Sequence, residues 1–164
     1  MAGTAEKHWE GLTGKGKRFA IVASRFNGEI VEKLVNGAKR AFREYGVADE
    51  DIKVYWCPGA LEIAPLARRV ARHWCTSSSA PLDGIVCCGA VIQGETDHYR
   101  FVAAESMAGV AGLANEANIA VGNAILTVAT LAQALARCRE DNSNKGYEAA
   151  VAVLVMAAQY EQLP

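Results

Sequence analysis

A strand end, a glycine turn and a helix start follow one another in the run Gly-Ala-Val-Ile-Gln-Gly-Glu-Thr-Asp-His at 89–98. The first turn of a helix carries unpaired backbone N–H groups, and these groups together with the Thr96 hydroxyl can hold a phosphate. His98 falls in that first turn, and a histidine beside an anion site can move protons near neutral pH. The glycine spacing fits neither a Walker loop nor a dinucleotide fingerprint. The segment therefore predicts a small-anion site with a proton-transfer group, although a lone histidine can also be structural.

Two other corners carry residues that could face a ligand. Phe26 lies in Ser24-Arg25-Phe26-Asn27, where its ring either folds back onto the core or presents an aromatic face to a planar molecule. In the run Cys-Pro-Gly-Ala-Leu-Glu-Ile at 57–63, Gly59 allows close approach of a backbone. Glu62 falls at a helix start, where the helix dipole favours a carboxylate whether or not it binds a ligand. The residue types leave both pairs of alternatives open.

Arg137 and Lys145 flank a polar stretch near the end of the chain. A cation at a helix C-terminus and a solvated lysine account for them, and anion binding is the alternative. The three histidines are far apart and no cluster of Cys and His forms, so no metal site is expected, and His8 and His73 carry no functional expectation. The spacing also permits a Cys88–His98 nucleophile pair, although a cysteine in mid-strand is usually a core residue.

These residues are positioned by alternating strands and helices. Apolar runs predict strands over 19–24, 52–56, 82–92 and 119–127. Helical periodicity predicts helices over 29–45 and 61–74. Further helices are expected over 131–139 and 147–159, and one that is capped by Thr96 or Asp97 and ends at Glu116. Pro65 is then expected in a first helical turn. The alternation indicates an α/β fold with a four-stranded parallel sheet covered on both sides. Ligands bind beyond the carboxyl ends of such strands, which directs attention to the loops around Phe26, Gly59, Gln93 and Asn123.

Composition sets the remaining bounds. The 164 residues are 51% hydrophobic and 21% charged, which predicts one folded domain over 1–164 with 1–18 as an N-terminal arm. A formal net charge of -1 excludes the broad basic footprint of a nucleic-acid binder. The five cysteines are odd in number and form no Cys-x-x-Cys pair, which indicates reduced thiols in a cytosolic protein. No signal peptide is expected, and the uncharged tract 117–136 is interpreted as a strand followed by a helix rather than a membrane span.

Four segments, in order and spacing, resemble the 6,7-dimethyl-8-ribityllumazine synthase family: Ser24-Arg25-Phe26-Asn27, the run at 58–63, the run at 89–99 and Asn144-Lys145-Gly146. The resemblance extends over about 19–159. It implies a flavodoxin-like, three-layer α/β/α sandwich and a cytoplasmic enzyme that uses no metal and no organic cofactor. It also implies condensation of 5-amino-6-(D-ribitylamino)uracil with 3,4-dihydroxy-2-butanone 4-phosphate, the penultimate step of riboflavin biosynthesis. Members are homopentamers, or assemblies of pentamers, with active sites between neighbouring subunits, and no nucleic-acid or membrane partner is implied.

The resemblance also assigns roles to individual residues. Phe26 would stack on the pyrimidine ring, and Asn27 beside it would bind substrate too. His98 would shuttle protons, Arg137 would grip the phosphate, and Lys145 would lie near the ribityl chain. The remaining substrate-binding positions serve the ribityl side (Ala60, Leu61, Glu62), the ring edge through the backbone (Ala90, Val91, Ile92), the phosphate (Glu95, Thr96) and the far side of the pyrimidine (Asn123).

The sequence departs from the family pattern in three places. Asn123 replaces an aromatic residue of many members, and Gln93 replaces a basic one. The linker 139–143 lacks the glycine-containing kink of shell-forming members, which favours an isolated pentamer or a pair of pentamers over a shell. The first two changes keep a second interpretation open, in which the chain carries a flavin or lumazine without turnover, and a purely structural assembly protein is a third.

Overall fold

Four parallel strands form one sheet in the computed structural model, which describes residues 9–77 and 80–163. They are β1 (Phe19–Ser24), β2 (Ile52–Cys57), β3 (Gly84–Ile92) and β4 (Ala120–Val128), in the spatial order β2-β1-β3-β4. Strand order 2-1-3-4 is that of flavodoxin-like sheets. Ser24 pairs with Cys57, so β1 and β2 end together, whereas Ala23 pairs with Cys88 and β3 runs on to Ile92 beyond the end of β1.

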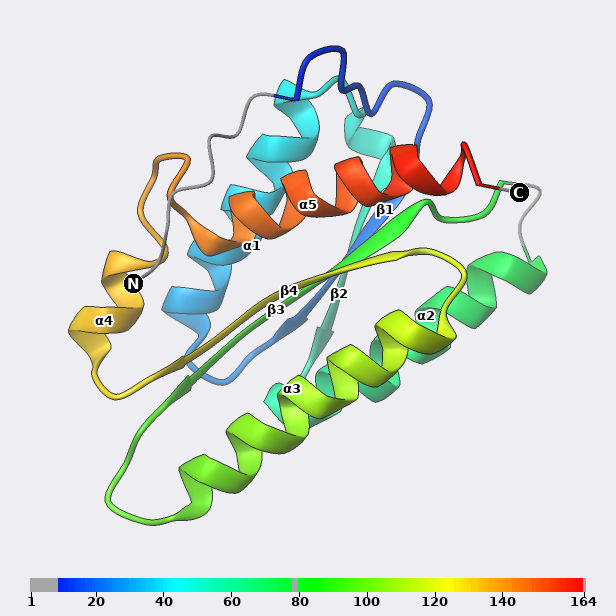
Figure 1. The fold of residues 1–164 in the computed structure, drawn as a ribbon. Helices are drawn as coiled ribbons and strands as arrows, with labels where there is room; N and C mark the ends of the chain where they lie inside the picture. Colours follow the sequence, from blue (N-terminus) through cyan, green and yellow to red (C-terminus); the bar gives the residue numbers. More distant parts are fainter. Residues whose placement is uncertain (1–8, 78–79, 164) are drawn as a thin grey trace.

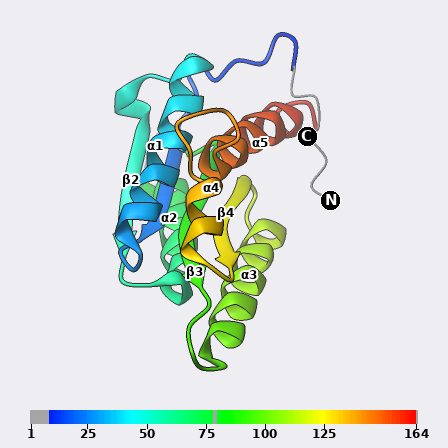
Figure 2. The same ribbon diagram turned by 90° about the vertical axis from the view of Figure 1, so that its left-hand side faces the viewer.

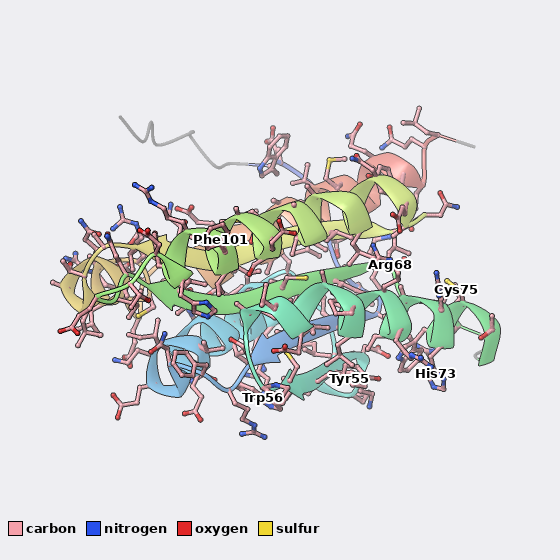
Figure 3. All side chains as sticks on the ribbon, turned by 90° about the horizontal axis from the view of Figure 1, so that it is seen from below. Tyr55, Trp56, Arg68, His73, Cys75 and Phe101 are labelled. Carbon is pink, nitrogen blue, oxygen red and sulfur yellow. The ribbon has the colours of Figure 1, made fainter. Side chains whose placement is uncertain are left out.

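Helices cover both faces of the sheet and complete the three layers (Figure 1). On one face lie α1 (Gly28–Glu44) and α5 (Lys145–Tyr160), with the short α4 (Leu131–Ala136) beside them, as Figure 2 shows from the side. On the other lie α2 (Ile63–Ser77) and α3 (His98–Glu116), joined by an ion pair of Arg68 with Glu116 at 3.0 Å (Figure 3). Short 3₁₀ turns precede β2 (Asp49–Asp51) and α2 (Ala60–Glu62).

Burial follows from the apolar periods of the sequence. All six residues of β1 are buried because helices pack on both of its faces. Phe19 of β1 stacks on Phe42 of α1 with ring centroids 4.4 Å apart, and this pair belongs to the core under α1 and α5. A second core under α2 and α3 contains Ile63, Ile85 and Leu113. The sheet therefore separates two apolar layers and fixes which strand ends face which helices.

The start of α5 lies very close to α1. A Cβ at Gly146 would lie 1.9 Å from the carbonyl oxygen of Leu34, so no larger residue fits there without a backbone shift. The preceding Asn144 is almost fully buried, and its Oδ1 accepts bonds from the Gly146 and Tyr147 N–H groups at 2.8 and 3.2 Å. The capped helix start is thus held against α1 by one amide side chain and one missing side chain.

The expected fold class is confirmed, and differences arise at element ends. Glu62 belongs to a 3₁₀ turn before α2, and Pro65 falls in the first turn of that helix as predicted. Because Asn144 caps it, α5 begins two residues earlier than expected. Asp97 occupies the N-cap of α3, but its side chain makes no capping bond. Asn123 lies in the middle of β4, so the expectation of a loop around it was wrong.

Two further expectations concern the tract 117–136 and the N-terminal arm. The tract contains β4 and α4, which confirms the strand-and-helix interpretation. Among the residues described, no helix combines the length and the apolar character needed to cross a bilayer. Residues 1–8 of the expected arm, His8 among them, lie outside the described part of the chain.

Replacing Gly146 by alanine should lower the free energy of unfolding by about 3 kcal/mol, because the added methyl group overlaps the Leu34 backbone. Urea denaturation followed by circular dichroism measures the change. Gly28→Ala at the start of α1 is the matched control, since a Cβ there meets nothing within 4 Å, and it should raise stability by up to about 1 kcal/mol. Equal losses in the two variants would contradict the close approach as the cause.

Candidate active site

A cavity of about 350 Å³ opens at the carboxyl ends of the strands, on the side of the sheet covered by α2 and α3. It receives residues from the β1–α1 corner, the turn before α2, the end of β3 and the start of α3. Those lining it are Phe26, Gly59, Ala60, Leu61, Glu62, Ala90, Val91, Ile92, Gly94, Thr96, His98, Tyr99 and Val102. The structure therefore brings together three corners that are far apart in the sequence.

Phe26 faces outward, so of its two alternatives the one that folds the ring onto the core was wrong. Its side chain is 71% exposed and lines the cavity. Two backbone bonds extend the β1–β2 pairing beyond the sheet, from Arg25 N–H to Cys57 O at 2.8 Å and from Phe26 N–H to Pro58 O at 3.0 Å. The Arg25 guanidinium lies 4.5 Å from the centroid of the Trp56 ring, which Figure 3 labels on β2. Backbone and cation–π contacts thus hold the corner that presents the aromatic ring.

Asn27 joins this corner to the end of β3. Its backbone is left-handed, with φ 56° and ψ 42°, a conformation that asparagine tolerates better than most residues. Its Nδ2 donates to the carbonyl oxygen of Ala90 at 2.8 Å. That bond fixes Ala90 and its neighbours Val91 and Ile92, which form one wall of the cavity. Asn27 itself does not line the cavity.

The Glu62 carboxylate hydrogen-bonds within the turn to which Glu62 belongs. Its Oε2 accepts a bond from the Gly59 N–H at 2.9 Å, so the carboxylate closes the 3₁₀ turn that begins at Ala60. Ala60, Leu61 and Glu62 nevertheless all line the cavity. The carboxylate is therefore fixed by the fold and remains beside the space that a ligand would fill.

The start of α3 forms the opposite wall. Thr96 and His98 line the cavity and are exposed, whereas Glu95 does not line it. The N–H groups at a helix start point toward any anion placed there. Tyr99 and Val102 also line the cavity, and neither was assigned a role from the sequence. Helical spacing was the available signal for Val102, because it lies four residues after His98 and therefore on the same face.

Besides Asn27 and Glu95, three further predicted residues lie outside the cavity. Asn123 is exposed, and its Oδ1 accepts a bond from Ile125 N–H at 2.9 Å. Arg137 follows α4, and its Nη1 donates to Gln133 O at 3.0 Å, which is the helix C-terminal role. Lys145 pairs with Glu148 at 2.6 Å.

Arg137 and Lys145 are nevertheless neighbours. The Lys145 N–H donates to the carbonyl oxygen of Arg137 at 2.9 Å, which closes the connection between α4 and α5 into a loop. The side chains of Arg137 and Lys145 therefore start from neighbouring points of the backbone, in the connection between α4 and α5. In a single chain that region and the cavity are separate.

The cysteines offer no nucleophile to the cavity. All five are free; Cys75 is exposed and the other four are buried. Cys88 lies in the core under α1 and α5, where complete burial raises its pKa, so the Cys88–His98 pair was wrong. Burial first and the Glu62 carboxylate second raise the pKa of Cys57 to about 11. Within 9–77 and 80–163, no group of three or more His, Cys, Asp or Glu side chains could hold a metal ion.

Comparison with known proteins shows which family this chain resembles. The family model described as 6,7-dimethyl-8-ribityllumazine synthase matches residues 16–161. A curated relative from Anaeromyxobacter sp. (strain Fw109-5), named 6,7-dimethyl-8-ribityllumazine synthase, is 46% identical over 146 residues, which cover 89% of this chain and 86% of the relative. The match to the family model spans every strand and helix from β1 to α5. The chain belongs to the 6,7-dimethyl-8-ribityllumazine synthase family.

Proposed function

We propose that the protein condenses 5-amino-6-(D-ribitylamino)uracil with 3,4-dihydroxy-2-butanone 4-phosphate to give 6,7-dimethyl-8-ribityllumazine, phosphate and water. The observation that carries the proposal is the cavity in which an outward-facing aromatic ring, a helix start and a histidine meet. These three features suit a planar heterocycle, an anionic group and proton transfer respectively. Membership of the family supplies the reaction.

The first substrate would bind between the two corners that precede α1 and α2. Phe26 stacks on the pyrimidine, and Asn27 holds Ala90 so that the backbone of Ala90, Val91 and Ile92 can bond the edge of the ring. Ala60, Leu61 and Glu62 receive the ribityl side. Thr96 and the N–H groups at the start of α3 bind the phosphate of the second substrate, with Glu95 contributing its backbone.

The chemistry needs proton transfers at every step. The 5-amino nitrogen attacks the ketone carbon, water leaves and an imine forms. Phosphate then departs by elimination, the enol tautomerises, and attack by the ribityl-bearing nitrogen closes the ring with loss of a second water. His98 accepts and returns protons in this sequence, because it lines the cavity beside the phosphate end. Holding two substrates together supplies much of the remaining acceleration.

Asn123, Arg137 and Lys145 would enter the site from a neighbouring subunit. This proposal is supported by their position, since all three are outside the cavity of their own chain and two are joined by a backbone bond. A guanidinium can bind the leaving phosphate through two parallel bonds, and Lys145 would reach the ribityl chain. Asn123 would face the far side of the pyrimidine.

We propose a homopentamer as the basic assembly, in an isolated or paired form. Its support is the exposed side of α3, where Phe101 is 69% exposed (Figure 3) and Ala104, Ala108 and Ala111 follow at helical spacing. Small side chains permit close approach of another backbone. The glycine-free connection after α4 is fixed by Asp141, whose carboxylate accepts the Ser143 N–H at 2.8 Å. That turn supports a pentamer over a shell.

We further propose one domain over 1–164 and a cytoplasmic location. The two cores share a single sheet, which supports one cooperative unit. Free cysteines fit a reducing compartment.

His98→Ala should lower kcat by about 10²-fold without abolishing turnover, because substrate positioning remains and only assisted proton transfer is lost. Fluorescence of the lumazine product measures the rate. His73→Ala on α2 is the control, since His73 lies outside the cavity, and its rate should equal that of the parent. An unchanged rate in His98→Ala would refute the proton role, and tight flavin binding without turnover in the parent would favour the carrier interpretation.

Arg137→Ala should raise the KM for the butanone phosphate by roughly 10- to 100-fold, since a charged hydrogen bond contributes about 1.5–3 kcal/mol. Excess phosphate substrate should restore the rate, and Arg137→Lys should recover it only in part because lysine lacks the fork. Arg69→Ala on α2 serves as the matched control. A change confined to the KM of the uracil substrate would contradict the phosphate assignment.

Coexpression of His98→Ala and Arg137→Ala chains tests whether sites are shared. If each site takes His98 from one chain and Arg137 from the next around a ring, an equal mixture leaves about a quarter of the sites with both groups. At a low concentration of the butanone phosphate, the mixed assembly should therefore turn over faster than an assembly of either single variant alone. A rate equal to the average of the two variants would mean that each chain builds its own site.

A further inference from the structure

A second hollow, of about 290 Å³, lies between α1 and the connection from α4 to α5. Figure 2 shows that orange connection beside α1, and this place is called the α1 hollow below. It shares no residue with the cavity at the strand ends. Apart from Gly37, the residues lining it are polar or charged: Lys33, Asn36, Arg40, Arg139, Glu140 and Asn144.

The walls of the α1 hollow are held in place by Asn144, which is only 2% exposed. Its Nδ2 donates both to Lys33 O at 3.1 Å and to Arg139 O at 2.9 Å. Its Oδ1 is occupied by the start of α5, and a Cβ at Gly37 would lie 2.2 Å from that oxygen. One buried side chain therefore ties together the backbones of two cationic residues that are more than a hundred positions apart in the sequence.

The charges that line the α1 hollow are mostly positive. Arg40 is fixed by bonds to Asn142 Oδ1 and Asp141 O at 2.8 and 2.7 Å, and it lies over the Tyr147 ring. In the described part of the chain, the Lys33 ammonium and the Arg139 guanidinium have no hydrogen-bond or ion-pair partner. Glu140 supplies the one carboxylate of the lining.

Two other carboxylates are close but engaged. Glu44 bonds the Tyr147 hydroxyl at 2.7 Å and lies 3.5 Å from Arg40. Asp141 accepts bonds from Ser143, which are the main reason that its pKa is lowered, with smaller contributions from Arg139 and Arg40. Neither Glu44 nor Asp141 lines the hollow, so the lining carries three cations against one acid.

We infer that the α1 hollow binds a small tetrahedral oxyanion, either free phosphate or the phosphate group of a small monoester. The buried Asn144 amide fixes the backbones that carry Lys33 and Arg139 on opposite walls, so an ammonium and a guanidinium fork are available to such a ligand without rearrangement of the backbone. The fixed Arg40 adds a third positive charge, and Glu140 limits the affinity. This site does not depend on the proposed reaction.

Equilibrium dialysis against radiolabelled orthophosphate, at fixed ionic strength in chloride, tests the inference on the assembled protein. All chains carry Arg137→Ala, which weakens phosphate binding at the proposed active site. Adding Lys33→Met with Arg139→Met should weaken the remaining binding by about tenfold or more, because two charged contacts are lost. Glu140→Gln should tighten it by a few-fold. Lys39→Met, a cation of α1 outside the hollow, should leave it unchanged.

Absence of phosphate binding, or binding that is indifferent to Lys33 and Arg139, would overturn the inference. So would an equal loss in Lys39→Met, since that indicates a general charge effect. If the double variant fails to fold, Glu140→Gln is sufficient as a test: unchanged or weaker phosphate binding in that variant would overturn the inference. Displacement by glycerol 2-phosphate would assign the hollow to monoesters, and no displacement would assign it to free phosphate. Phosphate binding here in a protein that lacks turnover would overturn only the proposed function.

Discussion

The contact between the start of α5 and α1 decides where the last helix of the chain can lie. Gly146 meets the Leu34 backbone at a distance that excludes any side chain, and Asn144 fills the space beside Gly37. Because α5 is capped and seated there, its apolar residues Val151 and Leu154 cover the sheet. The same contact fixes the connection that presents Arg137 and Lys145. A packing constraint inside the core thus determines the geometry of charged groups at the surface.

On the other side of the sheet, the candidate active site depends on bonds rather than on close packing. The β1–α1 corner is tied to β2 by two backbone bonds and to β3 by the Asn27 amide. Phe26 can remain exposed because the backbone around it, and not the burial of its ring, holds it in position. The turn before α2 is closed in the same way by Glu62. The cavity is therefore preorganised in one chain, while the proposed phosphate-gripping arginine lies elsewhere on the surface.

The sequence was sufficient for the layers and for much of the cavity, since each strand and α-helix was expected near its observed place and most of the lining residues lie at or beside the predicted strand ends. It could not say that Phe26 points outward, because a lone aromatic residue at a strand end fits either orientation. The predicted strand over 119–127 contained Asn123, which lies within β4, so only the expectation of a loop around that residue was wrong. Tyr99 and Val102 were missed because neither carries reactive chemistry. The α1 hollow could not be predicted from the sequence, because Lys33 and Arg139 are brought together only by their bonds to Asn144, which join distant segments.

Asn27 is a site where slow deamidation would change the structure. Asparagine amides are thermally labile, and this one precedes Gly28, whose small size does little to hinder attack by its backbone nitrogen. Deamidation would replace a donor by a carboxylate that can only accept, opposite the Ala90 carbonyl. The attack expels ammonia and forms a cyclic imide, and water opens the imide to aspartate or to isoaspartate. Aspartate keeps the left-handed backbone, isoaspartate lengthens the chain by one atom, and both lose the tie to β3. Aged preparations would then contain acidic isoforms with a loosened cavity wall.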